Sequence, residues 1–151
     1  MRHILISIAL LTATIAGALL AQQATAPEAA PQVIIADKAV VDAALAKTAV
    51  LSRNADHMVA GGRRDTGGVA EQHEKAYDIY YVTDGEAIYV TGGKLINSKQ
   101  TGPGEMLGGT IDGGEARSVK KGDVIVVPPG IPHWWKETKG ISYLIIKVNK
   151  P

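Results

Sequence analysis

Glycine is concentrated in one stretch of this 151-residue chain. Thirteen of the seventeen glycines lie between Gly61 and Gly114, many as adjacent pairs such as Gly61-Gly62. Short runs rich in β-branched and aromatic residues lie among and after them, at 79–82, 87–91, 124–127 and 142–148. Turn residues about every 8 to 12 positions between short apolar runs are typical of antiparallel sandwiches and barrels. The sequence therefore predicts an all-β domain over residues 51–151.

One α-helix is expected before the β domain, over residues 37–50. Asp37 is a good N-cap, and the segment from Lys38 to Ala49 is rich in helix formers. Val41, Ala44, Leu45 and Thr48 fall on one face of this segment, and the helix could pack on a partner subunit.

The first 21 residues have the pattern of an export signal. Met1-Arg2-His3 precede an uncharged apolar stretch that ends at Ala21, a suitable cleavage position. The alternative is an uncleaved anchor, because residues 4–21 could just span a bilayer. Residues 22–36, rich in Ala, Gln and Pro, predict a flexible leader. We expect a periplasmic or secreted protein that has no membrane attachment after signal cleavage.

Composition excludes several classes of function. Sixteen Lys and Arg against fifteen Asp and Glu leave a net charge of +1 with no basic run, so no nucleic-acid partner is expected. The absence of cysteine excludes disulfides, thiolate metal sites and a cysteine nucleophile.

Two of the predicted strands end at turn residues. Residues 124–127 are a continuous apolar run, which predicts a strand buried on both faces in the middle of a sheet. Pro128-Pro129-Gly130 end it shortly before His133. The strand at 79–82 leads into Asp84-Gly85, a hairpin signal, and residues 102–114 are expected to be a turn-rich crossing between sheets.

The segment that contains His133 resembles the second sequence motif of the cupin superfamily. That motif is a Gly, five residues, Pro-x-Gly, two residues and a His, and Gly122, Pro128, Gly130 and His133 match it. The first cupin motif is His-x-His, three or four residues, Glu, six residues and Gly. It is matched with two substitutions, because Glu71 replaces its first His and Asp78 its Glu, while His73 and Gly85 are retained.

The resemblance implies a cupin double-stranded β-helix, a jelly-roll barrel, that holds a divalent metal ion. The metal ligands it implies are His73, His133, Asp78 and Glu71. On a strand Glu71 and His73 would project to one face, and a mixed nitrogen and oxygen set suits Zn, Mn, Fe or Ni. The alternatives are that the two substitutions mark a cupin that has lost its metal, or that Glu71 only orients His73.

Other candidate residues surround these motifs. The adjacent residues Arg63 and Arg64 could bind a substrate carboxylate through a bidentate guanidinium contact, although a solvated charge pair at a turn is the simpler interpretation. Tyr80 is a candidate pocket residue for which core packing is the default. Trp135 faces the barrel by strand parity and could form an apolar wall or stack on a sugar or aromatic substrate. His57 could be a fourth imidazole ligand, but a partly exposed strand histidine is the expected role.

The leading functional hypothesis is an exported metal-dependent enzyme acting on a small polar molecule by isomerase, lyase or oxygenase chemistry. In it Glu71 or Asp78 would move a proton. The alternative is a non-catalytic module that binds a sugar or organic acid. The family resemblance also implies a possible homodimer formed by sheet extension.

Overall fold

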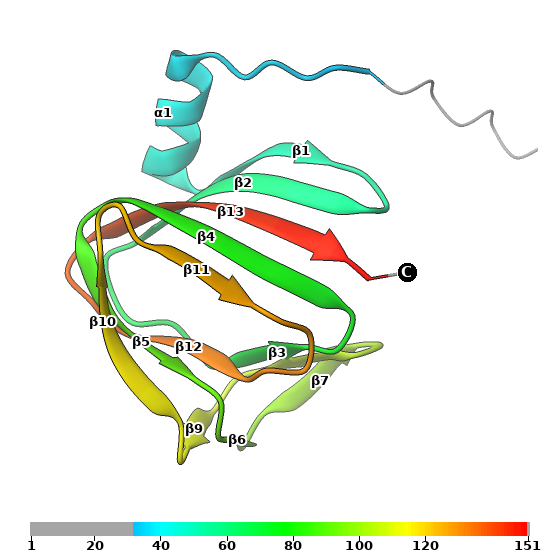
Figure 1. The fold of residues 1–151 in the computed structure, drawn as a ribbon, viewed down its shortest axis with the longest axis vertical. Coiled ribbons are helices and arrows are strands. Elements are labelled where there is room, and N and C mark those ends of the chain that lie inside the picture. Colours follow the sequence, from blue (N-terminus) through cyan, green and yellow to red (C-terminus); the bar gives the residue numbers. More distant parts are fainter. Residues whose placement is uncertain (1–31, 151) are drawn as a thin grey trace, which may run out of the picture. The chain divides into compact units, whose positions relative to one another are not determined.

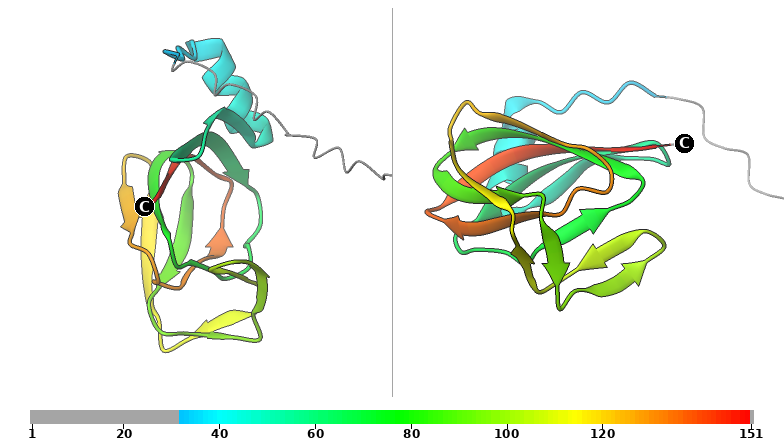
Figure 2. Two further views of the ribbon diagram at one scale, coloured as in Figure 1. Left: turned by 90° about the vertical axis from the view of Figure 1, so that its right-hand side faces the viewer. Right: turned by 60° about the horizontal axis from the view of Figure 1, so that its bottom comes forward.

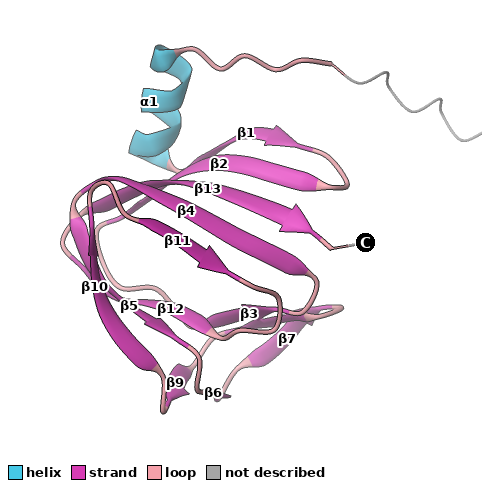
Figure 3. Ribbon diagram, in the orientation of Figure 1, coloured by secondary structure: helices cyan, strands magenta, loops and turns pink. Residues whose placement is uncertain are grey.

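Two β-sheets face each other, and one helix lies against the first of them (Figure 1). This computed structural model describes residues 32–150, so the expected signal and most of the expected leader lie outside the described residues. Figure 2 shows the two sheets from the side, and Figure 3 shows how much of the chain is strand. The predicted all-β architecture with an N-terminal helix is confirmed.

The first sheet has five strands in the order β1-β2-β13-β4-β11. Their bounds are β1 Ala49–Arg53, β2 His57–Arg64, β13 Ile141–Asn149, β4 Ala76–Asp84 and β11 Val124–Val127. The long central strand β13 pairs with β2 on one side and β4 on the other. In this register Lys147 lies opposite Asp78 of β4 and Met58 of β2.

The second sheet has six strands in the order β10-β5-β12-β3-β8-β7, and a two-stranded ribbon of β6 and β9 adjoins it. The bounds are β10 Glu115–Lys120, β5 Glu86–Thr91, β12 His133–Thr138, β3 Glu71–His73, β8 Glu105–Leu107, β7 Lys99–Gly102, β6 Lys94–Ile96 and β9 Thr110–Asp112. The stretch 102–114, expected to be a turn-rich crossing, therefore contains β8 and β9.

The helix α1 spans Lys38–Lys47, and the side chain of Asp37 caps it by accepting a hydrogen bond from the Val40 amide at 2.9 Å. It ends before the predicted limit of residue 50, because Ala49 is already paired with Gly61 in the sheet. Ala44 is its buried residue. Among the described residues, no helix has the length and hydrophobicity needed to cross a membrane.

Two sequence predictions are wrong, one about the turn after β4 and one about the position of β11 in its sheet. Asp84-Gly85 does not close a hairpin, because β4 belongs to the first sheet and β5 to the second, so this turn carries the chain from sheet to sheet. The apolar strand β11 is an edge strand, not a central one. Its residues alternate: Val127 is buried, while Val124 and Val126 are 63% and 55% exposed.

The core between the sheets is built around Trp and Tyr, because the chain has no Phe. Trp135 stacks on Tyr143 with ring centroids 4.9 Å apart, and it meets Tyr80 and Tyr89 edge-on at 5.3 and 4.4 Å. Buried aromatic pairs of this geometry add to the free energy gained from area burial. Tyr80 also turns its hydroxyl group toward Asp78, in the polar site described next.

Candidate metal centre

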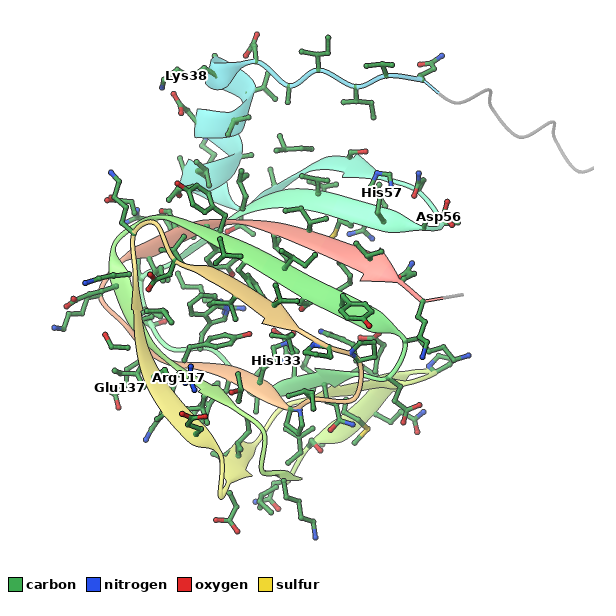
Figure 4. All side chains as sticks on the ribbon, viewed as in Figure 1. Lys38, Asp56, His57, Arg117, His133 and Glu137 are labelled. Atoms are coloured by element: carbon green, nitrogen blue, oxygen red, sulfur yellow. The ribbon has the colours of Figure 1, made fainter. Side chains whose placement is uncertain are left out.

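His133 reaches the interior from the first residue of β12. The corner Pro128-Pro129-Gly130 turns the chain there, with Gly130 at φ 80° and its amide donating to the His73 carbonyl at 2.7 Å. The ring is 1% exposed, and Figure 4 shows it between the two sheets. Its Nδ1 lies 3.0 Å from the carbonyl oxygen of Ile131, which can only accept a hydrogen bond. The neutral ring therefore carries its proton on Nδ1 and turns the Nε2 lone pair inward.

His73, at the end of β3, lies beside His133 with ring centroids 5.3 Å apart. The expected meeting of these two imidazoles inside one β enclosure is confirmed. The Nδ1 of His73 lies 2.5 Å from Glu105 Oε2, and its Nε2 lies 2.9 Å from Lys147 Nζ. Because an ammonium only donates, the neutral ring carries its proton on Nδ1, which donates to Glu105.

Two carboxylates complete the group. Asp78 Oδ2, from β4 of the opposite sheet, lies 3.4 Å from Nε2 of both His73 and His133. The two Glu71 carboxylate oxygens lie 3.7 Å from His73 Nε2 and 3.6 Å from His133 Nε2. One ligand atom from each of the four side chains falls within 4.8 Å of all the others.

These four residues fit a divalent metal ion. Ligand atoms bonded to one ion at about 2.0–2.1 Å in a tetrahedron lie about 3.3 Å apart, close to the spacings of Asp78 with the two imidazoles. His133 Nε2 and Asp78 Oδ1 are buried without a hydrogen-bond partner among the described residues. Buried polar atoms without partners are uncommon and call for an explanation such as a bound ion. Two imidazoles and two carboxylates are also ligands that Zn, Mn, Fe and Ni accept.

The charges in the group are mutually dependent. Burial alone would raise the pKa of Asp78, but the two imidazoles and the Lys147 charge hold it far below its ordinary value of 3.8. Burial would lower the pKa of His73, but Asp78 and Glu105 outweigh it and Lys147, so the pKa is raised above 6.5. Asp78 is therefore ionised throughout the neutral range.

Lys147 brings a fixed positive charge to the same group. Its Nζ lies 3.5 Å from Asp78 Oδ1 and donates to the inward-facing nitrogen of His73. A metal ion and this hydrogen bond need the same lone pair of His73. Binding of a metal by His73 therefore requires the Lys147 ammonium to move away.

A pocket of about 270 Å³ opens beside these side chains. Its lining includes Glu71, Asp78 and Lys147 together with apolar side chains of the first sheet. Tyr80 both lines it and belongs to the core, and its hydroxyl donates to Asp78 Oδ2 at 3.0 Å. Burial raises the pKa of Tyr80, so the hydroxyl stays protonated.

The other predicted residues lie elsewhere. Trp135 faces inward as its parity predicted, but it is 1% exposed within the aromatic core and does not line this pocket. Arg63 is outside: it pairs with Asp65 at 2.7 Å on the surface. His57 is a half-buried residue at the start of β2, close to the β1–β2 turn in Figure 4, and takes no part in the four-residue group.

Two residues of the site, Lys147 and Glu105, were missed in the sequence, and Arg64 was named only together with Arg63. Lys147 lies four positions after Tyr143 on the same strand, so both side chains point to the same, inward face. A charged residue on the inward face of an apolar strand could have been recognised from the sequence. Arg63 and Arg64 are adjacent on a strand, so their side chains point to opposite faces. The same alternation could have identified Arg64 as the one that lines the pocket. Glu105 gave no such signal, because its contact depends on β8 pairing with β3.

Comparison with known proteins agrees with this geometry. The cupin family model matches residues 67–151, more than half of the chain. The chain belongs to the cupin family. No curated protein matches this cupin in sequence.

Solved structures were compared with this cupin, and one of them supports its fold. A hydroquinone 1,2-dioxygenase from a Sphingomonas species, with 4-hydroxybenzoate bound, aligns with a TM-score of 0.50 at 12% identity over 71% of each chain. A protein with a double-stranded β-helix domain from Klebsiella pneumoniae gives 0.48 at 16% identity, covering 66% of this cupin and 73% of that chain. The family match and the alignment with the dioxygenase structure confirm the predicted cupin double-stranded β-helix fold, and its two sheets remain separate in residues 32–150.

Proposed function

We propose that this cupin is an exported metal-dependent enzyme that acts on a small polar molecule. Its metal ligands are His73, His133, Asp78 and Glu71. The observation that carries the proposal is the convergence of two inward-facing imidazole nitrogens on a buried, ionised Asp78. A divalent ion in such a set supplies a Lewis acid that polarises a carbonyl or hydroxyl oxygen of the substrate.

The two carboxylates have different roles in this proposal. Asp78 is 2% exposed and its depressed pKa keeps it ionised, so it serves as a ligand and cannot supply a proton. The Glu71 side chain is 21% exposed and lines the pocket, where a substrate could exchange a proton with it. Glu71 is therefore the one of the four ligands that could leave the ion and act as the general acid or base.

The metal content of the purified protein tests the proposal. After incubation with Mn, Fe, Ni or Zn and removal of excess ion, elemental analysis should give one ion per chain. His73→Ala and His133→Ala should lose most of it, because each removes an inward-facing nitrogen. His57→Ala is the matched control and should keep it. A wild-type protein without stoichiometric metal, or alanine variants that bind like the wild type, would refute the proposal.

A non-catalytic binding module is the second candidate. It is favoured by Lys147, which supplies the countercharge of Asp78 and occupies the His73 lone pair. In that case ligand binding should be insensitive to chelators and to both alanine substitutions.

A further inference from the structure

Arg64 is a cation without a carboxylate partner beside the candidate metal centre. It is half-buried and lines the same pocket as Glu71 and Asp78. Among residues 32–150 its one side-chain hydrogen bond is with Tyr143, and no carboxylate pairs with it. Arg63, its neighbour, has its charge neutralised by Asp65. A half-buried guanidinium whose donors are mostly unused is suited to bind an anion.

The position of Arg64 is fixed by its surroundings. Its Nε donates to the Tyr143 hydroxyl at 3.1 Å, and its Nη1 lies so close to Gly68 that an added Cβ there would be 2.7 Å away. The Tyr143 ring is itself held between Trp135 and the backbone of Gly62. Such a guanidinium loses little freedom when it binds a ligand, which favours affinity.

The balance of charge in the pocket also favours an anion. Arg64 and Lys147 offset the charges of Glu71 and Asp78 in the pocket lining. A divalent ion, whose binding requires Lys147 to move away, would leave one positive charge in excess over Glu71 and Asp78 in the pocket lining, supplied by Arg64. Opposite charge in a partly enclosed site strengthens binding because water screens it less than at the surface.

The dimensions of the pocket limit the size of the ligand. Its volume of about 270 Å³ lies just below the range of about 300–1,000 Å³ found for drug-sized ligands. The side chains of Val50, Met58 and Ile145 contribute apolar walls. The space therefore suits a compact molecule with an apolar part.

We propose that the ligand of this pocket is a small organic acid whose carboxylate binds to Arg64. The planar guanidinium can donate a hydrogen bond to each carboxylate oxygen. This pairing orients the acid so that its other functional group points toward Glu71 and the candidate metal centre. This inference rests on the proposed function and names its substrate class.

Calorimetric titration of the metal-loaded protein tests the inference with matched acid and amide probes. The probes are acetate, benzoate and succinate against acetamide, benzamide and succinamide, with inorganic phosphate as a separate anion. At least one acid should bind the wild type about tenfold or more tightly than its amide. Arg64→Gln should remove that preference. Arg64→Lys should weaken it severalfold, because an ammonium cannot donate the two parallel hydrogen bonds that a planar guanidinium gives to a carboxylate. Arg63→Gln, the control, should behave like the wild type.

Each outcome decides the inference. No acid preferred over its amide, tighter binding of phosphate than of any acid, or an equal preference in Arg64→Gln and Arg63→Gln would overturn it. The last result would mean that another group holds the carboxylate. Metal content, measured in the same samples, should stay at the wild-type level in Arg64→Gln. If the wild-type protein binds no stoichiometric metal, that result would instead count against the proposed function.

Discussion

Both histidines of the candidate metal centre have their outer nitrogen tied to an oxygen of the chain. Glu105 accepts from His73, and the Ile131 carbonyl accepts from His133. Such partners fix the tautomer and the ring orientation, and a carboxylate also makes the imidazole a stronger base. The binding strength of the site is therefore set partly by residues that do not face it.

Substitution of Glu105 should weaken metal binding without removing a ligand. We expect Glu105→Gln to lower metal affinity by roughly 10- to 100-fold, the range observed when such supporting groups are lost. Competition with a fluorescent chelator would measure the change. Glu115→Gln, which breaks an exposed ion pair with Arg117, is the control. Equal affinities in the two variants would contradict the role given to Glu105.

Removal of the Lys147 charge should have the opposite effect. Lys147→Met keeps a chain of similar length but no longer donates to His73 or repels a cation, so metal affinity should rise about tenfold or more. The same competition measurement applies, with Lys139→Met as the control at an exposed ion pair with Glu86. An affinity unchanged or lowered in Lys147→Met would show that the ammonium does not compete with the ion.

The stability of the chelator-treated protein should depend on pH through His73. Because its pKa is raised on folding, His73 contributes stability that is complete below pH 6.5 and is lost as pH rises through the folded value. Urea unfolding with EDTA should show a larger loss between pH 5.5 and 8.5 in the wild type than in His73→Gln. The same loss in both proteins would rule out this contribution. The groups that face His73 are Glu71, Asp78, Glu105, His133 and Lys147.

At the scale of elements, periodicity and turn residues identified the start of the helix and four of the thirteen strands in residues 32–150, namely β4, β5, β11 and β13. They failed where pairing between distant strands decides the outcome. An apolar run such as 124–127 has the same composition at an edge as in a sheet centre, so its position could not be read locally. Likewise, Asp84-Gly85 turns the chain in either setting, and only the partners of β4 and β5 show that it joins two sheets.

The contact between β2 and α1 depends on Gly61. A Cβ there would lie 2.5 Å from the carbonyl carbon of Ala44, so the helix would have to move. We expect Gly61→Ala to lower the free energy of unfolding by about 1–3 kcal/mol, as overpacked cores do. Urea denaturation would measure it. Gly102→Ala should change stability little, because its Cβ would make only an ordinary contact at 3.7 Å with Glu105. Similar losses in both variants would contradict this packing.

At the scale of the whole molecule, the candidate site draws on both sheets. His73, Glu71 and His133 come from one sheet, while Asp78 and Lys147 come from the other. The cupin motifs predicted the first four, because motif spacing encodes the fold that joins them. Lys147 and Glu105 were not predicted, since neither motif includes them and their contacts exist only after the sheets pack.

Export is the remaining prediction at this scale. Expression of the full chain in a bacterium should give a periplasmic or secreted protein that begins at Gln22, because residues 1–21 have the features of a cleaved signal. Intact-mass measurement of each cell fraction would locate the cut. A protein that keeps Met1 and stays in the membrane fraction would instead support the anchor.

The ammonium of Lys147 gives the maturation of this protein a definite order. The carboxylate of Asp78 has a permanent countercharge supplied by its own chain, so the two sheets can close without waiting for an ion. Acquisition of a metal is then an exchange of one cation for another in a finished fold. Under the proposed function, a protein built this way completes its folding first and takes its metal from the supply in its compartment.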